Sequence, residues 1–153
     1  MRRLLKFYKY AFAWENYLLL ARAIRAARLV RQHLEERAAS PHFSSSLNAV
    51  DRLYLPPQPG WKISDAEKIV RFASFLINFP VTWGKCVQQS LIAYRLLNGY
   101  GIPAKICYGV SRDESIHDGH AWVVRSSEPE RALAEKSDPR EKFKLIYTSP
   151  LPD

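Results

Sequence analysis

The period of the apolar residues changes near residue 100, and this change restricts the class of fold. Helical spacing is found from about residue 85 to residue 97, on Val87, Leu91, Tyr94 and Leu97 or Leu96. From residue 104 the pattern alternates, which predicts a strand over 104–110 with Ile106, Tyr108 and Val110 on one side. Further strands are expected at 120–124 and 145–147. A helix followed by strands joined through polar loops predicts an α+β fold with an antiparallel sheet.

A second helix is expected to begin at Ser64. Ser64 and Glu67 match a capping box, in which each side chain satisfies a free amide of the first turn. One face of this helix is apolar, and Pro80 follows its predicted end.

A long N-terminal helix is predicted over residues 14–38. Its predicted apolar stripe consists of Tyr17, Leu20, Ile24, Ala27, Val30 and Leu34. Arg22, Arg25, Arg28 and Arg31 fall on a different face. This basic face is interpreted first as a solvated surface, and alternatively as a docking surface for an acidic peptide, a partner or anionic lipid.

Turn residues separate this helix from the rest of the chain. Ser40-Pro41, three consecutive serines at 44–46 and the Pro-rich stretch 55–60 interrupt regular structure. The predicted organisation is a helical N-terminal region with a linker over residues 1–60, followed by the core over residues 61–153.

Composition narrows the function classes. At 153 residues, 47% of them hydrophobic, the chain can form one compact domain, and its net charge of +8 favours an acidic partner. The basic residues are spread out without a recognition motif, so nucleic-acid binding is not predicted. The first residues lack a cleavage site and any apolar run of the roughly 20 residues that a membrane span needs. Together with only two cysteines, this predicts a reduced, cytoplasmic protein. Membrane contact is possible but is not predicted.

Cys86 and His120 are the strongest candidates for catalytic residues. Cys86 falls where a helix should begin, and the free amides and dipole at that end favour a thiolate, the nucleophilic form of cysteine. His120 opens the second predicted strand directly after Gly119. A base within hydrogen-bonding reach of the sulfur would complete a nucleophilic pair.

Two other interpretations of these residues are open. Cys86 and His120 could both be packed core residues, as Cys107 is expected to be within its strand. Zinc binding by Cys86, Cys107, His117 and His120 is not favoured, because their spacings match no usual ligand pattern.

The order of motifs resembles the transglutaminase-like cysteine protease superfamily, and within it the leader peptidases of lasso-peptide biosynthesis. The motifs are Gly84-Lys85-Cys86-Val87, Ser90-Leu91, a leucine-rich helix ending at Gly99, Gly109-Val110, and His120-Ala121-Trp122-Val123. The resemblance covers roughly residues 64–142 and implies a papain-like core, with the nucleophile at a helix N-terminus packed on an antiparallel sheet.

The resemblance also implies a third catalytic residue, an acid that follows the histidine. Glu135 is assigned as the acid that orients His120, with Asp138 as the alternative. The chain departs from the family at Gln89, where an arginine is frequent, and in the longer connection over residues 126–131.

The activity implied by this resemblance is removal of the leader from a ribosomally made lasso-peptide precursor, without cofactor or metal. The implied partners are the precursor peptide, a separate leader-recognition protein and an ATP-dependent macrocyclase. A transglutaminase-like amidase or peptidase of another pathway, and a non-catalytic assembly subunit of the same fold, are the alternatives.

Overall fold

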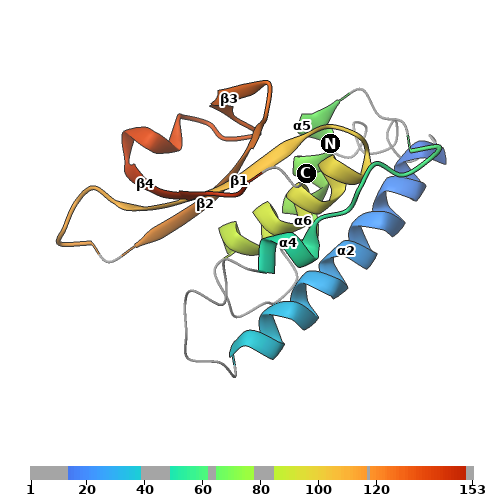
Figure 1. Ribbon diagram of the computed structural model, residues 1–153, viewed down its shortest axis with the longest axis horizontal. Helices are drawn as coiled ribbons and strands as arrows, with labels where there is room; N and C mark the ends of the chain where they lie inside the picture. The colour runs from blue at the N-terminus through green and yellow to red at the C-terminus, as the bar shows by residue number, and fades with distance from the viewer. Residues whose placement is uncertain (1–13, 39–48, 62–64, 78–84, 117, 151–153) are drawn as a thin grey trace, which may run out of the picture.

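Helices lie on one side of a four-stranded antiparallel sheet in the computed structural model of the chain, which describes residues 14–38, 49–61, 65–77, 85–116 and 118–150 (Figure 1). The helices are α2 (Trp14–Ala38), α4 (Ala49–Leu53), α5 (Ala66–Ile77) and α6 (Lys85–Gly99). The strands are β1 (Ala104–Ser111), β2 (Gly119–Arg125), β3 (Glu128–Ala132) and β4 (Phe143–Thr148), with a 3-10 turn, η1 (Pro139–Glu141), before β4. This is the predicted α+β class.

The sheet has the order β3-β2-β1-β4. The central pair β1–β2 forms a long hairpin in which Cys107 lies opposite Trp122, and Gly109 lies opposite His120. β3 was missed in the sequence interpretation, which expected a charged connection there. Its residues, Glu-Pro-Glu-Arg-Ala, lack a strand pattern because β3 is a short edge strand, and proline and charge are tolerated at an edge.

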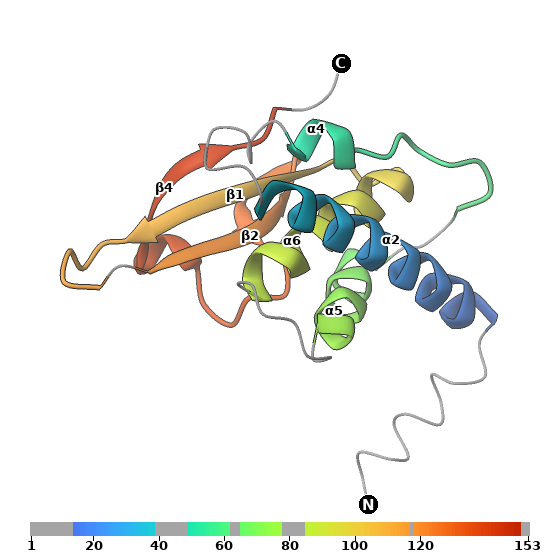
Figure 2. The same ribbon diagram turned by 90° about the horizontal axis from the view of Figure 1, so that it is seen from below.

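α6 is the central helix of the fold. It lies between the sheet and α2, and most of its residues from Leu91 onward are buried (Figure 2). The main core joins apolar residues of α2, α5, α6, β1 and β2, including Leu19, Ile69, Leu97, Ile106 and Val123. A smaller cluster of Cys107, Trp122 and Val124 lies on the other face of the sheet.

The predicted apolar stripe of α2 was partly right, since Val30 is buried and Ala27 and Leu34 pack against the core. The structure buries Leu19, Ala23, Ala26 and Val30, whereas Tyr17 is 53% exposed and Ile24 is 38% exposed. The true stripe has alternating steps of four and three residues, and its two alanines leave room for a neighbouring helix. Ala23 and Ala26 thus form part of the contact, while Tyr17 and Ile24 project outward.

Arg22 was predicted to lie on a solvated face of α2, but in the structure its side chain contacts other residues. Its guanidinium lies 4.0 Å above the ring centroid of Trp61 and donates a hydrogen bond of 2.9 Å to the hydroxyl of Tyr100. This contact ties α2 to the Pro-rich loop and to the end of α6. Arg25 and Arg28 are exposed as predicted.

The Pro-rich stretch wraps around the end of α6. The amide of Gln58 donates to the carbonyl of Gly99, and a side chain at Gly99 would collide with Leu55 and Trp61. Just before this loop the structure contains α4, a short helix that sequence reasoning missed. The predicted breaks at Ser40-Pro41 and at residues 44–46 lie outside the described residues.

α5 begins at Ala66 with Asp65 as its capping residue. A carboxylate oxygen of Asp65 accepts the amide of Lys68 at 3.2 Å, and Glu67 pairs with Arg71 and Arg131. Glu67 therefore takes part in ion pairs, and Ser64, the predicted cap, lies outside the described residues.

α2 shares its core with α5 and α6. The predicted N-terminal region thus packs onto the rest of the fold, and the division of the chain at residue 60 stays a prediction. Among the described residues, none of the helices has the length and apolar character required to cross a membrane.

Candidate functional site

Cys86 is the second residue of α6, the most enclosed helix of the fold. The first amides of a helix have no partner within it, so they present partial positive charge to any group placed there. α6 has 15 residues, and its first turn carries no acidic side chain that would oppose this charge. The Cys86 side chain is partly exposed and its thiol is free. It is therefore accessible at the end of a helix that favours an anion.

The sulfur of Cys86 lies at the open edge of β2. It is 4.0 Å from the carbonyl oxygen of Gly119. Odd-numbered residues of β2 direct their carbonyls away from β1, as the bond from the Leu133 amide to the Val123 oxygen shows. β3 pairs with β2 only at Val124 and Arg125, so it does not cover the edge beside Gly119. The nucleophile candidate thus lies at the unpaired part of this strand.

His120 follows Gly119 in the same strand, and two aromatic rings hold it. Its ring stacks on Phe143 with centroids 5.1 Å apart, and on Trp122 at 6.0 Å. These rings occupy the sheet face opposite α6. Directly across from His120 lies Gly109, where an added Cβ would be 3.0 Å from Phe143, Trp122 and the Lys144 carbonyl oxygen. Glycine at 109 therefore leaves the space that Phe143 and Trp122, the two rings stacked on His120, occupy.

Glu135 contacts the imidazole of His120. The distance from Nε2 of His120 to Oε1 of Glu135 is 3.2 Å, and both side chains are partly exposed. A carboxylate at Nε2 favours the tautomer that carries its proton there, which leaves the lone pair on Nδ1. Glu135 lies just beyond β3, after a turn in which Ala134 has a φ of 58°. The turn brings Glu135 back toward the first residues of β2.

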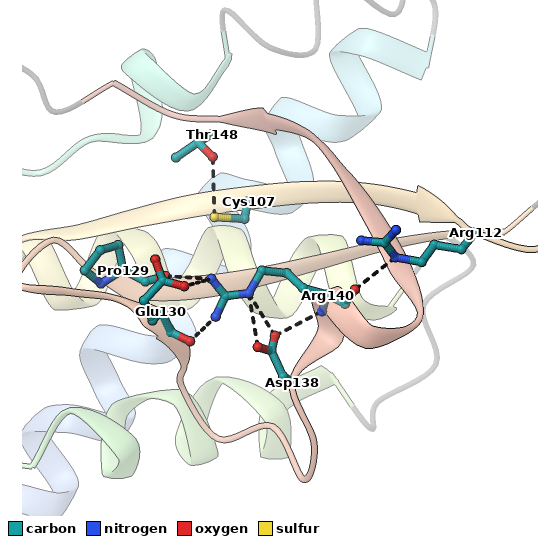
Figure 3. Close-up of polar contacts among 7 residues, drawn as sticks. All are labelled: Cys107, Arg112, Pro129, Glu130, Asp138, Arg140 and Thr148. Atoms are coloured by element: carbon teal, nitrogen blue, oxygen red, sulfur yellow. Dashed lines mark hydrogen bonds and ion pairs between the residues drawn. The ribbon is translucent and has the colours of Figure 1, made fainter.

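Asp138, the alternative acid, is bound elsewhere. Its carboxylate accepts hydrogen bonds from the backbone amide and Nε of Arg140, at 3.0 and 2.9 Å (Figure 3). These bonds hold the pKa of Asp138 below its ordinary value. The same guanidinium contacts Glu130, so Arg140 links η1 to β3 through charge-assisted hydrogen bonds. The structure therefore places Glu135, and not Asp138, beside His120.

The structure brings His120 and Glu135 together and brings Cys86 to the residue before His120. It does not join the thiol and the imidazole by a hydrogen bond. The two side chains approach the same end of β2, Cys86 from its open edge and His120 from the aromatic face. In enzymes without bound substrate, such catalytic contacts are often longer than in the reacting complex.

Tyr108 is a further polar residue near the sulfur that sequence reasoning did not single out. It packs against the main core, on the sheet face covered by α6. Burial, the neighbouring Tyr147 and the Cys86 sulfur all raise the pKa of Tyr108, so its hydroxyl keeps its proton. In the sequence, Tyr108 alternates with Ile106 on one side of the predicted strand, and this pattern indicates only a core position.

Cys107 belongs to the structural part of the protein, as predicted. It is buried on the aromatic face of the sheet, 3.7 Å from the Thr148 hydroxyl (Figure 3), and burial raises the pKa of its thiol. Cys86 lies at the α6 side, so the two cysteines are free and separated by the sheet. Among the described residues no cluster of three or more His, Cys, Asp or Glu could hold a metal ion, and His117 is not among them.

Comparison with known proteins adds a family to this geometry. Residues 17–148 match the family model of the transglutaminase-like superfamily. The chain belongs to the transglutaminase-like superfamily. The match includes α2, so the helical N-terminal segment from residue 17 is part of the family domain. No curated protein and no solved structure gave a significant match. Enzymes of this superfamily are generally cysteine proteases or transglutaminases.

Proposed function

We propose that this protein is a cysteine peptidase that removes the leader from a lasso-peptide precursor before macrocyclisation. The observation that carries the chemistry is the His120–Glu135 pair, placed at the strand end that Cys86 contacts from the N-terminus of α6. Membership of the superfamily supports this arrangement. The choice of a lasso-peptide precursor rests on the resemblance of the motifs around Cys86 and His120.

The first half of the reaction forms a thioester. Nδ1 of His120 accepts the thiol proton while Sγ of Cys86 attacks the scissile carbonyl carbon. The resulting oxyanion faces the free amides at the start of α6, which stabilise it. His120 then gives the proton to the departing nitrogen, the carbon–nitrogen bond breaks, and the amine product leaves.

The second half hydrolyses this intermediate. His120 takes a proton from a water molecule, whose oxygen attacks the thioester carbonyl. The carbon–sulfur bond breaks, the carboxylic acid product leaves, and the proton returns to the sulfur. Glu135 stabilises the imidazolium in both halves and keeps Nδ1 available. The net reaction consumes one amide and one water and needs neither metal nor organic cofactor.

The proposal includes three partners that the family resemblance implies. The precursor peptide is the substrate, a separate protein presents its leader, and an ATP-dependent macrocyclase consumes the product. A chain with two cysteines and no disulfide between them is typical of a reducing compartment, so we place the reaction in the cytoplasm.

Mass spectrometry of precursor cleavage tests this function. Wild-type protein is mixed with its precursor and recognition protein, beside Cys86→Ala and His120→Ala. We expect only the wild type, and neither variant, to cleave the precursor at a single bond into a leader and a core peptide. The two variants should keep the wild-type circular dichroism spectrum, which separates lost chemistry from lost folding.

Three results would contradict the proposal. Cleavage that survives Cys86→Ala would exclude this residue as the nucleophile. A wild-type protein that binds the recognition protein but cleaves no precursor would favour the non-catalytic assembly subunit. Cleavage of unrelated peptides alone would instead favour a transglutaminase-like peptidase of another pathway.

A further inference from the structure

Almost all of the net positive charge lies in the first 34 residues of the chain. Eight of the 23 Lys and Arg residues, but only one of the 15 Asp and Glu residues, occur there, which gives +7 of the total +8. Between Asn16 and Leu34 there are four arginines and no acidic residue. The rest of the chain is nearly neutral, so attraction to an acidic surface is concentrated in the segment that contains α2.

The outer face of α2 combines this charge with large apolar side chains. Four of them are at least one-third exposed, namely Tyr17, Leu18, Ile24 and Leu29. Arg25 and Arg28 are exposed on the same side of the helix. Arg28 lies one turn after Ile24, and Arg25 lies one turn before Leu29, so cationic and apolar groups are neighbours along this face. We call these six residues the outer face of α2.

The two arginines of the outer face are available to an anionic partner. Among the described residues, neither Arg25 nor Arg28 forms an ion pair with a carboxylate, whereas Arg22 is held by Trp61 and Tyr100. Burial lowers the pKa of Arg95, and the nearby positive charge of Arg25 lowers it further. Arg25 and Arg95 are therefore close together, and no ion pair with a described carboxylate neutralises Arg25 or Arg28.

We propose that the outer face of α2 docks the protein onto an anionic membrane surface. Helices that lie in the membrane interface combine arginine or lysine with exposed aromatic and aliphatic side chains, which enter the boundary of the acyl chains. The preceding residues 1–13 have the same composition: Arg2, Arg3, Lys6 and Lys9 stand among Leu, Phe and Tyr, without an acid. The continuity of this composition over 34 residues favours a lipid surface over a compact acidic protein.

The position of α2 suits this role. It forms the side of the molecule away from the sheet, with α6 between them (Figure 2). Docking through α2 leaves the open edge of β2 and the His120–Glu135 pair in water. Since none of the described helices could span a bilayer, the association is peripheral. This inference does not depend on peptidase activity.

Vesicle flotation tests the inference with the full-length protein. The vesicles are phosphatidylcholine alone, or phosphatidylcholine with phosphatidylglycerol. We expect wild type to float only with the anionic vesicles, and added salt to weaken this binding. The paired substitutions Arg25→Glu/Arg28→Glu and Ile24→Gln/Leu29→Gln should each reduce the bound fraction several-fold.

A matched control separates this surface from net charge. Lys142→Glu/Lys144→Glu makes the same change in charge at exposed positions beside and within β4, and it should float like wild type. Circular dichroism checks the fold of each variant. The inference is overturned if folded wild type does not bind anionic vesicles, or if both α2 variants bind as well as wild type does. Loss of binding to an acidic partner protein in Arg25→Glu/Arg28→Glu, without vesicle binding by wild type, would assign the face to that protein instead.

Discussion

At the scale of single residues, the two cysteines have opposite environments and should react differently. Cys86 is partly exposed at the first turn of α6, whereas Cys107 is 5% exposed within β1. We expect iodoacetamide to modify Cys86 in the folded protein and to reach Cys107 only after unfolding. Peptide mapping would measure this, and equal labelling of both sites in native protein would contradict it.

The buried thiol of Cys107 also gives a pH dependence with a definite sign. Burial raises its pKa in the folded state, so in alkaline solution the unfolded thiol loses its proton first. The unfolded state then binds fewer protons, and the free energy of unfolding falls as pH rises above the ordinary thiol range. Cys107→Ala should lessen this alkaline loss in urea titrations, and an unchanged pH profile would argue against it.

Glu135 and Asp138 can be distinguished by isosteric substitution. Glu135→Gln removes the charge that stabilises the His120 imidazolium, and we expect kcat to fall by roughly 10²-fold or more. Asp138→Asn alters only the contact with Arg140 and should leave kcat near the wild-type value. Steady-state cleavage of the precursor would measure both. The reverse order of effects would move the role of orienting acid to Asp138.

Gly109 should be necessary because of the space that it leaves. An alanine there would place Cβ 3.0 Å from Phe143, Trp122 and the backbone oxygen of Lys144, which is closer than ordinary contact, so these neighbours would have to shift. We expect Gly109→Ala to lower the free energy of unfolding by about 1–3 kcal/mol. Gly119→Ala is the matched control, since its added Cβ meets only the Gly109 carbonyl oxygen, at 3.6 Å. Denaturant titration would compare them, and equal stabilities would show that the His120 pocket is not tightly packed.

At the scale of elements, the sequence predicted α6 and β1 from the period of their apolar residues, which reflects burial on one side. β2 and β4 were found instead from residues that favour strands, although β4 is largely exposed. β3 was not found because an edge strand needs no such pattern. The stripe of α2 was only partly placed, because Leu19, Ala23 and Ala26 are buried where Tyr17 and Ile24 were expected.

The same comparison applies to the candidate site. Cys86 and His120 could be selected from their motif and from their places at the beginnings of a helix and a strand. Glu135 was assigned to His120 only through the family resemblance, with Asp138 as the alternative. The residues alone could not decide between the two acids, since the choice depends on the turn at Ala134 and on the ion pair of Asp138 with Arg140. The stacking of Phe143 on His120 was likewise not predictable, because Phe143 comes from β4, which is distant in sequence.

Arg22 connects three elements, and this connection can be measured. Arg22→Ala removes the contact with Trp61 and the hydrogen bond to Tyr100. We expect a loss of about 1–2 kcal/mol in the free energy of unfolding. Arg28→Ala, at an exposed position of the same helix, should change it by less than about 0.5 kcal/mol. Thermal or urea unfolding tests the difference, and equal effects would mean that Arg22 does not hold the loop to α2.

At the scale of the whole molecule, the fold divides two tasks between its layers. The sheet and the start of α6 assemble the proposed peptidase site, and α2, on the other side of α6, presents the basic outer face (Figure 1). Both tasks rest on one core, since α2, α5, α6 and the sheet share it. The family match over residues 17–148 agrees with a single functional unit.

The central claim is that Cys86 forms a covalent bond with the substrate. Rapid acid quenching of wild type during precursor turnover, followed by intact-mass analysis and peptide mapping, tests it most directly. We predict an adduct with the mass of the acyl half of the precursor, attached at Cys86 and absent in Cys86→Ala. Cleavage that proceeds without this adduct, or an adduct mapped to another residue, would contradict the account.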